Sequence, residues 1–409
     1  MLFFASCNKK QILEKLDHDI TVIQITINED YLWSPDSGLF VIGNNGIALG
    51  NCNSIANYNQ NWEFPAELTL SQNGEKTNIN KVGFKIKGNC TRSNAMKSIG
   101  IYWRKEYGEK NTDYPFFGEE SAHNYKRLFL RNSGNDFGIT HIKDATITQI
   151  IKEFTAAEIQ NYKPSAVYLN NDYWGIYNIR DMITPHHFKY TYNVNEEYVD
   201  ILEGNEQSPK ADDGSTNLFL DEVIHFVQNN DLKDDQNFEE LSEKINVESY
   251  MDYIITQTYI ANGDQLENNV KWWRDRTTYE FRKWTWIIYD TDLGFNLNKV
   301  NEFWLGDLAG DHRSGFFLFN QMIKNDKFKD EFLERYAYFI DYVFEKERVK
   351  YIIKNLMENI EYEYTRHQKK WNTITKHNWN KKINQLIQFN NERNDFMQEK
   401  INNLIDEED

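Results

Sequence analysis

Cysteines are few in this chain of 409 residues, and long hydrophobic runs are absent. The three cysteines, Cys7, Cys52 and Cys90, are too few for a disulfide framework, and no Cys-x-x-Cys pair indicates a zinc site. No run of 18 or more apolar residues occurs, so we expect no segment that spans a membrane as a helix. The sequence also lacks internal repeats and Pro-rich or Ser-rich linkers.

Positive charge is also scarce, because 46 Lys and Arg stand against 63 Asp and Glu, for a formal net charge of −17. A general nucleic-acid binder needs a surplus of cations to displace the counterions of the phosphate backbone. The composition therefore argues against nucleic acid as a partner, but it does not exclude a local basic pocket for a triphosphate. With 40% hydrophobic and 27% charged residues, the chain should be globular and soluble, with one large core or two to three lobes.

Aromatic residues make up 15% of the chain, including 11 Trp and 24 Tyr. They are open to two interpretations, either large aromatic cores or surfaces on which sugars or bases stack. We favour the cores, because buried aromatic side chains dominate ordinary protein interiors.

The first ten residues begin with an apolar stretch that runs through small residues to Cys7. This pattern resembles the end of a bacterial lipoprotein signal, in which Cys7 would be lipidated, although the apolar run is short and a basic n-region is missing. The alternative is an incidental terminus. On the lipoprotein interpretation the protein is extracytoplasmic and touches the membrane only through Cys7. Cys52 and Cys90 then remain as a possible disulfide pair, which the sequence does not decide.

Hydrophobic periodicity predicts an α+β fold with a β-rich N-terminal portion and a mostly helical C-terminal lobe. We divide the chain into a signal remnant and tether, a β-rich portion, an α+β core and a helical lobe, at 1–19, 20–105, 106–305 and 306–409. Strands are expected at 21–27, 66–70, 82–87, 125–130, 165–169 and 174–179, and a later hairpin at 270–274 and 281–289. Helices are expected at 145–154, 217–228, 247–260 (with Asn246 as N-cap) and from 329 onward, where 361–404 reads as a solvated or antiparallel helical pair.

A first group of candidate site residues follows the helix predicted over 247–260. That helix ends at Asn262-Gly263, and the chain then presents Asp264 and, five residues later, Asn269 before a strand begins. Asp-x4-Asn is the spacing of a protein-kinase catalytic loop, in which the Asp accepts the proton of the substrate hydroxyl and the Asn binds magnesium. Alone, the match has little specificity, because Asp and Asn are common in turns.

A second group follows an apolar strand that runs directly into Asp290-Thr291-Asp292. Two carboxylates in this spacing can face one hard cation, which then bridges phosphate oxygens. The alternative is an Asx-turn that ends the strand. Together with Asp264 and Asn269 the pattern matches the order of kinase loops, although the strings His-Arg-Asp-Leu and Asp-Phe-Gly are absent. We therefore predict that Asp264, Asn269, Asp290 and Asp292 form a Mg²⁺ or Mn²⁺ site that handles the phosphates of a nucleotide.

A third, basic group lies in the polar, turn-like segment that follows the strand at 82–87. Lys87, Arg92 and Lys97 could neutralise a triphosphate there. The alternative is a solvent-exposed loop with incidental charges, and without the acidic groups that alternative would be preferred.

Four segments of the chain resemble the CotH-type kinases, the spore coat protein H family of atypical, secreted or surface protein kinases. Residues 85–92 with Lys97-Ser98 resemble the family pattern R-G-N-S-[ST]-R followed by K-K-S, and 130–136 resemble L-R-N-x-x-x-D. Residues 167–177 resemble V-Y-L-N-G-x-Y-x-G-x-Y. Residues 262–269 and 286–292 resemble N-x-D-x-x-x-x-N and W-x-x-x-D-x-D.

The resemblance implies an atypical protein-kinase-like fold, with 106–305 as a kinase-like catalytic core, and ATP- and metal-dependent phosphorylation of Ser or Thr in a surface or secreted protein. Carried over, Asp264 would be the catalytic aspartate. Asp290, supported by Asn269 and Asp292, would bind the metal. Arg92 and Lys97 would contact ATP.

The chain departs from the family patterns at three places. Lys87 stands where the family usually has Arg, Met96 where it usually has the first Lys of a pair, and Asp181 where a Glu is common. Asp181, one methylene shorter, can substitute as a nucleotide-site residue. The alternative hypotheses are a catalytically weak or inactive CotH-like surface protein that binds partners such as glycans, and another metal-dependent phosphoryl or nucleotidyl transferase.

Overall fold

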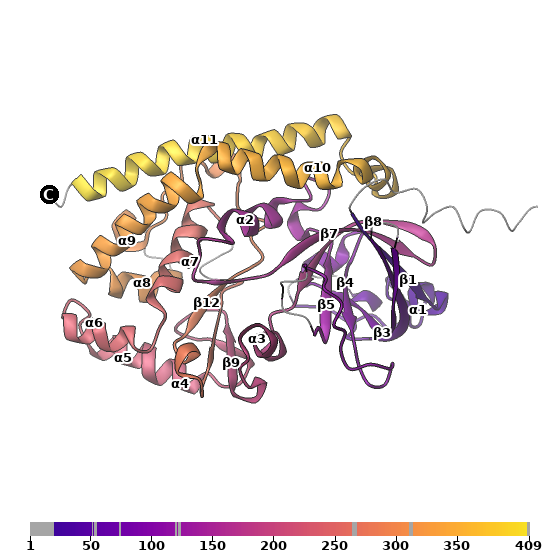
Figure 1. Cartoon of the computed structure of the whole chain (residues 1–409), viewed down its shortest axis with the longest axis horizontal. Coiled ribbons are helices and arrows are strands. Elements are labelled where there is room, and N and C mark those ends of the chain that lie inside the picture. The colour runs from indigo at the N-terminus through magenta and orange to yellow at the C-terminus, as the bar shows by residue number, and fades with distance from the viewer. Residues whose placement is uncertain are drawn as a thin grey trace, which may run out of the picture. The chain divides into compact units, whose positions relative to one another are not determined.

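The structure, a computed structural model, describes residues 20–50, 52, 55–72, 75–118, 121, 124–263, 268–310 and 314–406. Its fold is α+β, as predicted, with a β-barrel in the N-terminal half and helices toward the C-terminus (Figure 1). The described residues form two compact units, each assembled from separate stretches of chain. The barrel unit comprises the described residues within Met1–Ile139, Asn161–Met182 and Met357–Lys376. The helix-rich unit comprises the described residues within Thr140–Gln160, Ile183–Leu356 and His377–Asp409.

A closed sheet of seven strands forms the centre of the barrel unit. Its order is β1 (Thr21–Ile27), β2 (Phe64–Gln72), β3 (Glu75–Lys87), β4 (Ser98–Tyr102), β5 (Arg127–Arg131), β8 (Asp172–Asp181) and β7 (Tyr162–Leu169). Every pairing is antiparallel except that of β7 with β1, which is parallel and closes the barrel. Closure leaves none of these strands as an open edge.

The strands of the barrel follow the predicted hydrophobic alternation. β1 coincides with the predicted strand, and its alternate residues Ile23, Ile25 and Ile27 belong to the barrel core. The strands predicted at 66–70 and 82–87 lie within β2 and β3, which form a hairpin in which Gln72 pairs with Glu75. The turn residues of this hairpin lie outside the described residues. The strands predicted at 165–169 and 174–179 lie within β7 and β8, which pair as an antiparallel hairpin. Short helices complete the unit, namely α1 (Glu29–Trp33), η1 (Asn57–Asn59), η2 (Cys90–Ser93) and η3 (Gly134–Asp136).

The helix-rich unit is built on a five-stranded sheet. Its order is β10 (Lys210–Asp213), β9 (Val199–Glu203), β11 (Lys271–Asp275), β12 (Thr285–Ile288) and β6 (Glu158–Ile159). β11 and β12 form the later hairpin predicted from the sequence. Trp272, Trp284 and Trp286 on or beside these strands are fully buried, which supports the interpretation of the aromatic residues as core.

Helices make up most of the remaining chain of this unit. The helix α7 (Val247–Tyr259) begins at the predicted N-cap, where the Asn246 side chain accepts a hydrogen bond from the Ser249 N–H at 3.1 Å. The others in chain order are α2 (Lys143–Ile151), α3 (Pro185–Tyr192), η4 (Glu196–Tyr198), α4 (Asn217–Phe219), η5 (Leu220–Ile224), α5 (His225–Asn229), α6 (Asp235–Ser242), η6 (Tyr279–Phe281), η7 (Leu297–Lys299), η8 (Gly306–Ala309), η9 (Ser314–Phe316), α8 (Phe317–Met322), α9 (Asp326–Tyr338) and η10 (Phe339–Val343).

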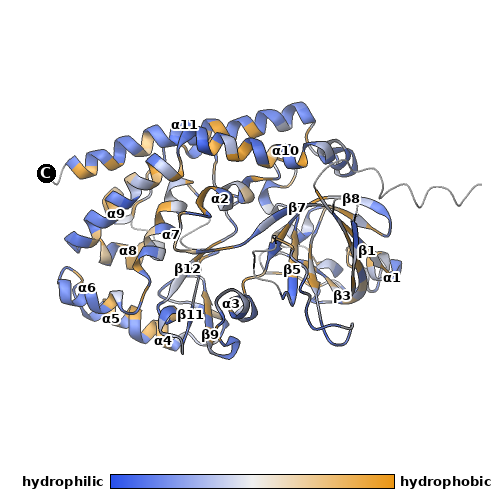
Figure 2. Cartoon of the chain, viewed as in Figure 1, coloured by the Kyte–Doolittle hydropathy of each residue, from blue (hydrophilic) through white to orange (hydrophobic). Residues whose placement is uncertain are grey.

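The two longest helices are α10 (Lys346–Trp371) and α11 (Lys376–Asp406), and they form an antiparallel pair. Lys346 forms an ion pair with Asp395, and Lys354 donates a hydrogen bond to Asn384 at 3.2 Å, so the start of α10 faces the later part of α11. Both helices carry hydrophilic and hydrophobic residues along their length (Figure 2). Among the described residues, no helix combines the length and hydrophobicity needed to cross a lipid bilayer.

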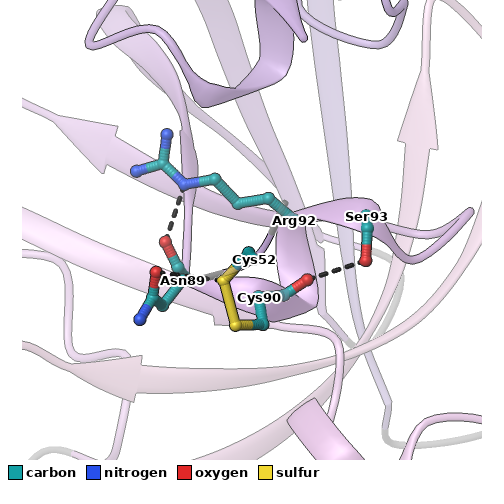
Figure 3. The surroundings of a disulfide bond; sticks show 6 residues. Cys52, Asn89, Cys90, Arg92 and Ser93 are labelled. Carbon is teal, nitrogen blue, oxygen red and sulfur yellow. Dashed lines mark hydrogen bonds between the residues drawn. A yellow bond between two sulfur atoms is a disulfide. The ribbon is translucent and has the colours of Figure 1, made fainter. Parts of the chain in front are cut away.

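Cys52 and Cys90 form a disulfide, with their sulfur atoms 2.02 Å apart (Figure 3). The bond joins the loop before η1 to the first residue of η2, across 38 positions of sequence. It settles the pairing that the sequence left open and fastens η2, which carries Arg92, to a distant loop. Cys7 lies outside the described residues.

We predict that replacing both Cys52 and Cys90 by Ser lowers the free energy of unfolding by up to ~4 kcal/mol, the loss of loop-closure entropy expected for a loop of this length. Urea denaturation of the full chain measures the change. Adding a reductant should move the wild-type curve toward that of the double variant and leave the variant's curve in place. Coincident wild-type curves with and without reductant would contradict the prediction.

Candidate functional site

Three chain segments of the helix-rich unit meet at one end of its sheet. Lys271 pairs with Ile287 and Trp273 with Thr285, so the chain entering β11 and the chain leaving β12 emerge at the same end of the hairpin. The Phe295 N–H donates a hydrogen bond to the Ile260 carbonyl at 2.9 Å, which joins the chain after β12 to the end of α7. The end of α7 therefore lies beside the chain that follows the Asp-x-Asp segment.

We call the place where the end of α7, the chain before β11 and the chain after β12 meet the junction. The predicted metal ligands differ in their exposure there. Asn269 precedes β11 and is half-buried, and Asp290, two residues beyond β12, is half-buried too. Asp292 is only 1% exposed. Asp264, the predicted catalytic residue, lies outside the described residues. Carboxylate and amide oxygens of this kind suit Mg²⁺ or Mn²⁺, so the donor chemistry fits the predicted ion.

No group of three or more His, Cys, Asp or Glu arranged to hold a metal ion is found in the described part of the chain. The predicted ligand set contains only two carboxylates within that part, Asp290 and Asp292, together with the amide of Asn269. The metal site therefore stays a prediction that depends on Asp264.

The backbone around the junction is strained. Ala261, Asn269, Asp290 and Phe295 have φ angles of 51°, 55°, 53° and 52°, in the left-handed region. This region costs residues with a Cβ atom roughly 1–2 kcal/mol, although Asn and Asp tolerate it better than Ala or Phe. Strain of this kind persists where surrounding contacts enforce it, and it clusters at functional sites. The concentration at this junction supports a functional role for it.

Asp144 contacts the middle residue of the Asp-x-Asp segment. Its Oδ1 atom accepts hydrogen bonds from the N–H of Thr291 at 3.0 Å and from the Thr291 hydroxyl at 2.9 Å. Asp144 lies in the first turn of α2 and is 5% exposed. Sequence reasoning missed this residue, because an acidic residue in the first turn of a helix is ordinary.

Two further side chains flank the junction. Burial raises the pKa of the Tyr289 phenol well above its ordinary value, and the neighbouring Asp290 adds to the rise, so Tyr289 is neutral. A Cβ atom on Gly263 would lie 2.1 Å from the Lys299 ammonium nitrogen. Position 263, directly before Asp264, therefore has no room for a side chain while Lys299 keeps its place.

In the barrel unit, Arg92 holds together the turn between β3 and β4. Its Nε donates to the Gly88 carbonyl at 2.6 Å, and its Nη1 donates to the carbonyls of Tyr58, Asn59 and Gln60 at 3.1, 3.2 and 3.3 Å. Arg92 is 9% exposed and lies beside the disulfide (Figure 3). One guanidinium thus joins η2 to the loop around η1.

Lys97 lies in the same turn and is 4% exposed. Its ammonium donates to the carbonyls of Arg92 at 2.6 Å and Asn94 at 3.1 Å, and it lies 3.9 Å from the centre of the Tyr58 ring. Burial lowers the pKa of Lys97 to about 8, and burial also lowers the pKa of Arg92.

Neither Arg92 nor Lys97 forms an ion pair with a carboxylate of the described residues. Buried charges are normally paired, because their transfer out of water is unfavourable. Two adjacent buried cations without an acidic partner favour the binding of an external anion.

The other two predicted nucleotide-site residues are placed by the strands of the barrel. Lys87 is half-buried at the end of β3, where it pairs with Ser98. Asp181 is 2% exposed at the end of β8, and its carboxylate accepts hydrogen bonds from the Asn161 N–H and side-chain amide, both at 2.8 Å. Asp181 at the end of β8 thus holds the residue directly before β7 in place.

Three of the segments quoted from the sequence interlock by hydrogen bonds in the barrel unit. The Asn132 side chain donates to the Met96 carbonyl at 2.6 Å and accepts from the Ser98 hydroxyl at 2.8 Å. The Tyr177 hydroxyl donates to the Lys97 carbonyl at 2.9 Å. The residues of these motifs therefore build one local structure around the turn that bears Lys97.

Comparison with protein families gives a match over most of the chain. The family described as CotH kinase protein matches residues 84–397, well over half of the chain. The chain belongs to the CotH kinase family. A search of curated proteins finds no match. The match begins in β3 and runs into α11, so it covers all four motif segments and confirms the resemblance seen in the sequence.

One departure of this CotH family member from the family pattern, Met96, lies in the core of the barrel unit. Met96 is fully buried in the barrel core, and its sulfur would lie 3.4 Å from a Cβ atom on Gly175. With a methionine at this core position, Lys97 remains as the single lysine of the pair.

We predict that Arg92→Met lowers the free energy of unfolding by ~2–3 kcal/mol, because several buried carbonyls lose their charged donor. Arg104→Met is the matched control. Arg104 pairs with Glu63 at 2.5 Å but is 46% exposed, and such surface pairs contribute under ~1 kcal/mol. Urea denaturation compares the two variants, and equal destabilisation would contradict the structural role of Arg92.

Proposed function

We propose that the chain is an ATP-dependent and divalent-metal-dependent protein kinase that phosphorylates Ser or Thr in surface or secreted proteins. Membership of the CotH kinase family supports the kinase class. The observation that carries the proposal is the pair of buried cations, Arg92 and Lys97, with no carboxylate partner among the described residues. The polyphosphate of ATP is an anion of matching charge.

Both cations keep donors that a phosphate can use. Lys97 has three N–H groups, and its two hydrogen bonds to carbonyls leave one. No acceptor among the described residues is bonded to Nη2 of Arg92, whose other donor nitrogens contact carbonyls. On this proposal Lys87 and Asp181 also contribute to the nucleotide site.

Asp290, Asp292 and Asn269 would hold Mg²⁺ or Mn²⁺ through carboxylate and amide oxygens. When bound, the ion neutralises the charge that develops on the phosphate oxygens. Asp264 accepts the proton of the attacking hydroxyl, the role of the Asp in a kinase catalytic loop. Catalysis then depends on positioning and electrostatic stabilisation, without a covalent intermediate.

The proposal includes an extracytoplasmic location with a lipid anchor at Cys7. The Cys52–Cys90 disulfide supports that location, because disulfides persist in oxidising compartments. A second candidate, a catalytically weak or inactive binding protein, is favoured by Met96, which replaces one lysine of the family pair with a core side chain.

The decisive experiment incubates the full chain and candidate acceptor proteins with labelled ATP and Mg²⁺ or Mn²⁺. We expect label on protein. Asp290→Ala should abolish metal-dependent nucleotide binding, whereas Asp264→Ala should spare binding and reduce turnover by at least ~100-fold, the contribution of a general base.

Identical labelling by wild type and Asp264→Ala would contradict the kinase proposal. No label on any protein would favour the inactive binding protein, and label on a non-protein acceptor would favour another transferase. Equal loss of binding and turnover in Asp264→Ala would contradict the separate roles assigned to Asp264 and Asp290.

Lys97 gives the nucleotide site a pH dependence. Its folded-state pKa of about 8 lies below the ordinary 10.5, so between these values the unfolded chain binds more protons and this group makes stability rise with pH. A bound phosphate favours the ammonium form and raises the pKa again. At pH near 8.5, ATP binding should therefore take up a proton.

Calorimetric titration of Mg²⁺-ATP in two buffers of different ionisation enthalpy measures that proton. We expect wild type to take up a fraction of a proton and Lys97→Arg to bind ATP without uptake, because the guanidinium is always charged. The same uptake in both proteins would show that Lys97 does not contact the phosphates.

A further inference from the structure

Asp144 is joined to the Asp-x-Asp segment by contacts that the proposed chemistry does not itself require. One carboxylate oxygen accepts both the main-chain N–H and the hydroxyl of Thr291, at 3.0 and 2.9 Å. The two residues are 147 positions apart in the sequence and both are buried. A contact to the main chain and the side chain together fixes the position and the rotation of the backbone at Thr291.

That backbone lies between the two carboxylates proposed to hold the metal. Asp290 has a left-handed φ of 53°, and the Gly294 N–H donates to the Thr291 carbonyl at 3.0 Å, closing a turn. A strained residue keeps its conformation only where its surroundings enforce it. The bonds from Asp144 hold the chain directly after the strained residue and directly before Asp292.

Asp144 is itself carried by a rigid element. Within α2, the Thr148 hydroxyl donates to the Asp144 carbonyl at 3.0 Å, and the far end of the helix is held where Arg348 Nη2 donates to the Ile150 carbonyl at 2.8 Å. Seven of the nine residues of α2 are buried. Metal ligands that neighbouring residues hold in place bind the metal more tightly than ligands on an unsupported loop.

We propose that Asp144 is a positioning residue, which acts through Thr291 to hold Asp290 and Asp292 in the geometry that binds the divalent metal. The inference rests on the proposed function and adds a residue to its metal site. Asp144 acts on the backbone of the loop and lies outside the ligand set.

The test measures Mn²⁺ binding to the full chain, with and without ATP, by the electron paramagnetic resonance of free Mn²⁺. Asp144→Ala should raise the Kd for Mn²⁺ by ~10-fold or more, the usual effect of losing a group that supports metal ligands. Thr291→Val, which keeps the N–H and loses only the hydroxyl, should raise it by a smaller factor. Thr291→Ser keeps both donors and should have the smallest effect of the three.

Asp275→Ala is the matched control. Asp275 is fully buried at the opposite end of β11, and it accepts hydrogen bonds from the N–H and hydroxyl of Thr277 at 3.2 and 3.0 Å. Its loss removes a buried carboxylate that accepts the N–H and hydroxyl of a threonine, in the same unit but away from the junction. We expect Asp275→Ala to lower stability and to leave the Kd for Mn²⁺ within ~2-fold of wild type, well below the ~10-fold shift expected for Asp144→Ala.

The outcomes separate this inference from the proposed function. If wild type shows no Mn²⁺ binding that depends on Asp290, the proposed metal site itself fails. If wild type binds Mn²⁺ and Asp144→Ala binds it equally well, only the positioning role fails. If Asp144→Ala and Asp275→Ala weaken Mn²⁺ binding equally, the effect is general destabilisation, and the inference is overturned. If Asp144→Ala does not fold, the Kd values of Thr291→Val and Thr291→Ser for Mn²⁺ are compared instead. Equal Kd values for these two variants would overturn the inference.

Discussion

Antiparallel pairing of β11 with β12 is the constraint on which the acidic part of the candidate site depends. Because Lys271 faces Ile287, the chain before β11 and the chain after β12 emerge together, and Asn269 and Asp290 come to one end of the sheet. The hydrogen bond from Phe295 to Ile260 adds the end of α7 to the same junction. Residues in left-handed conformations lie on all three segments, so the sheet and its neighbours hold a geometry that the isolated chain would avoid.

Much of the regular structure was predictable from sequence because it depends on local patterns. The strand at 21–27 alternates polar and apolar residues, and the cap of α7 is one side chain bonded three residues away. Closure of the barrel by β1 and β7, the pairing of Cys52 with Cys90, and the contact of Asp144 with Thr291 join positions far apart in the chain. Periodicity carries no information about such contacts. Each compact unit also draws on stretches separated in sequence, which composition along the chain does not express.

The acidic part of the candidate site and its basic part were predictable from the sequence to different degrees. Spacing and strand ends pointed to Asp290, Asp292 and Asn269, and their segments do meet the end of α7, although Asp264 lies outside the described residues. Residue type pointed to Arg92 and Lys97, but nothing in the sequence showed that both would be buried and bonded to main-chain carbonyls. A basic residue in a polar turn is usually exposed, and burial here follows from the loop around η1 that the disulfide fastens over the turn.

The structural role of these two cations is compatible with the proposed binding of phosphate, because main-chain carbonyls hold both charged groups in place. Arg92 satisfies four carbonyls through Nε and Nη1, and the planar guanidinium then fixes the direction of Nη2. Lys97 is held by two carbonyls and by the Tyr58 ring. Donors held in this way lose little side-chain entropy when an anion binds, and the anion offsets the unfavourable burial of both charges. On the proposed function, a phosphate is therefore favoured over a neutral ligand, because it offsets the burial of both charges.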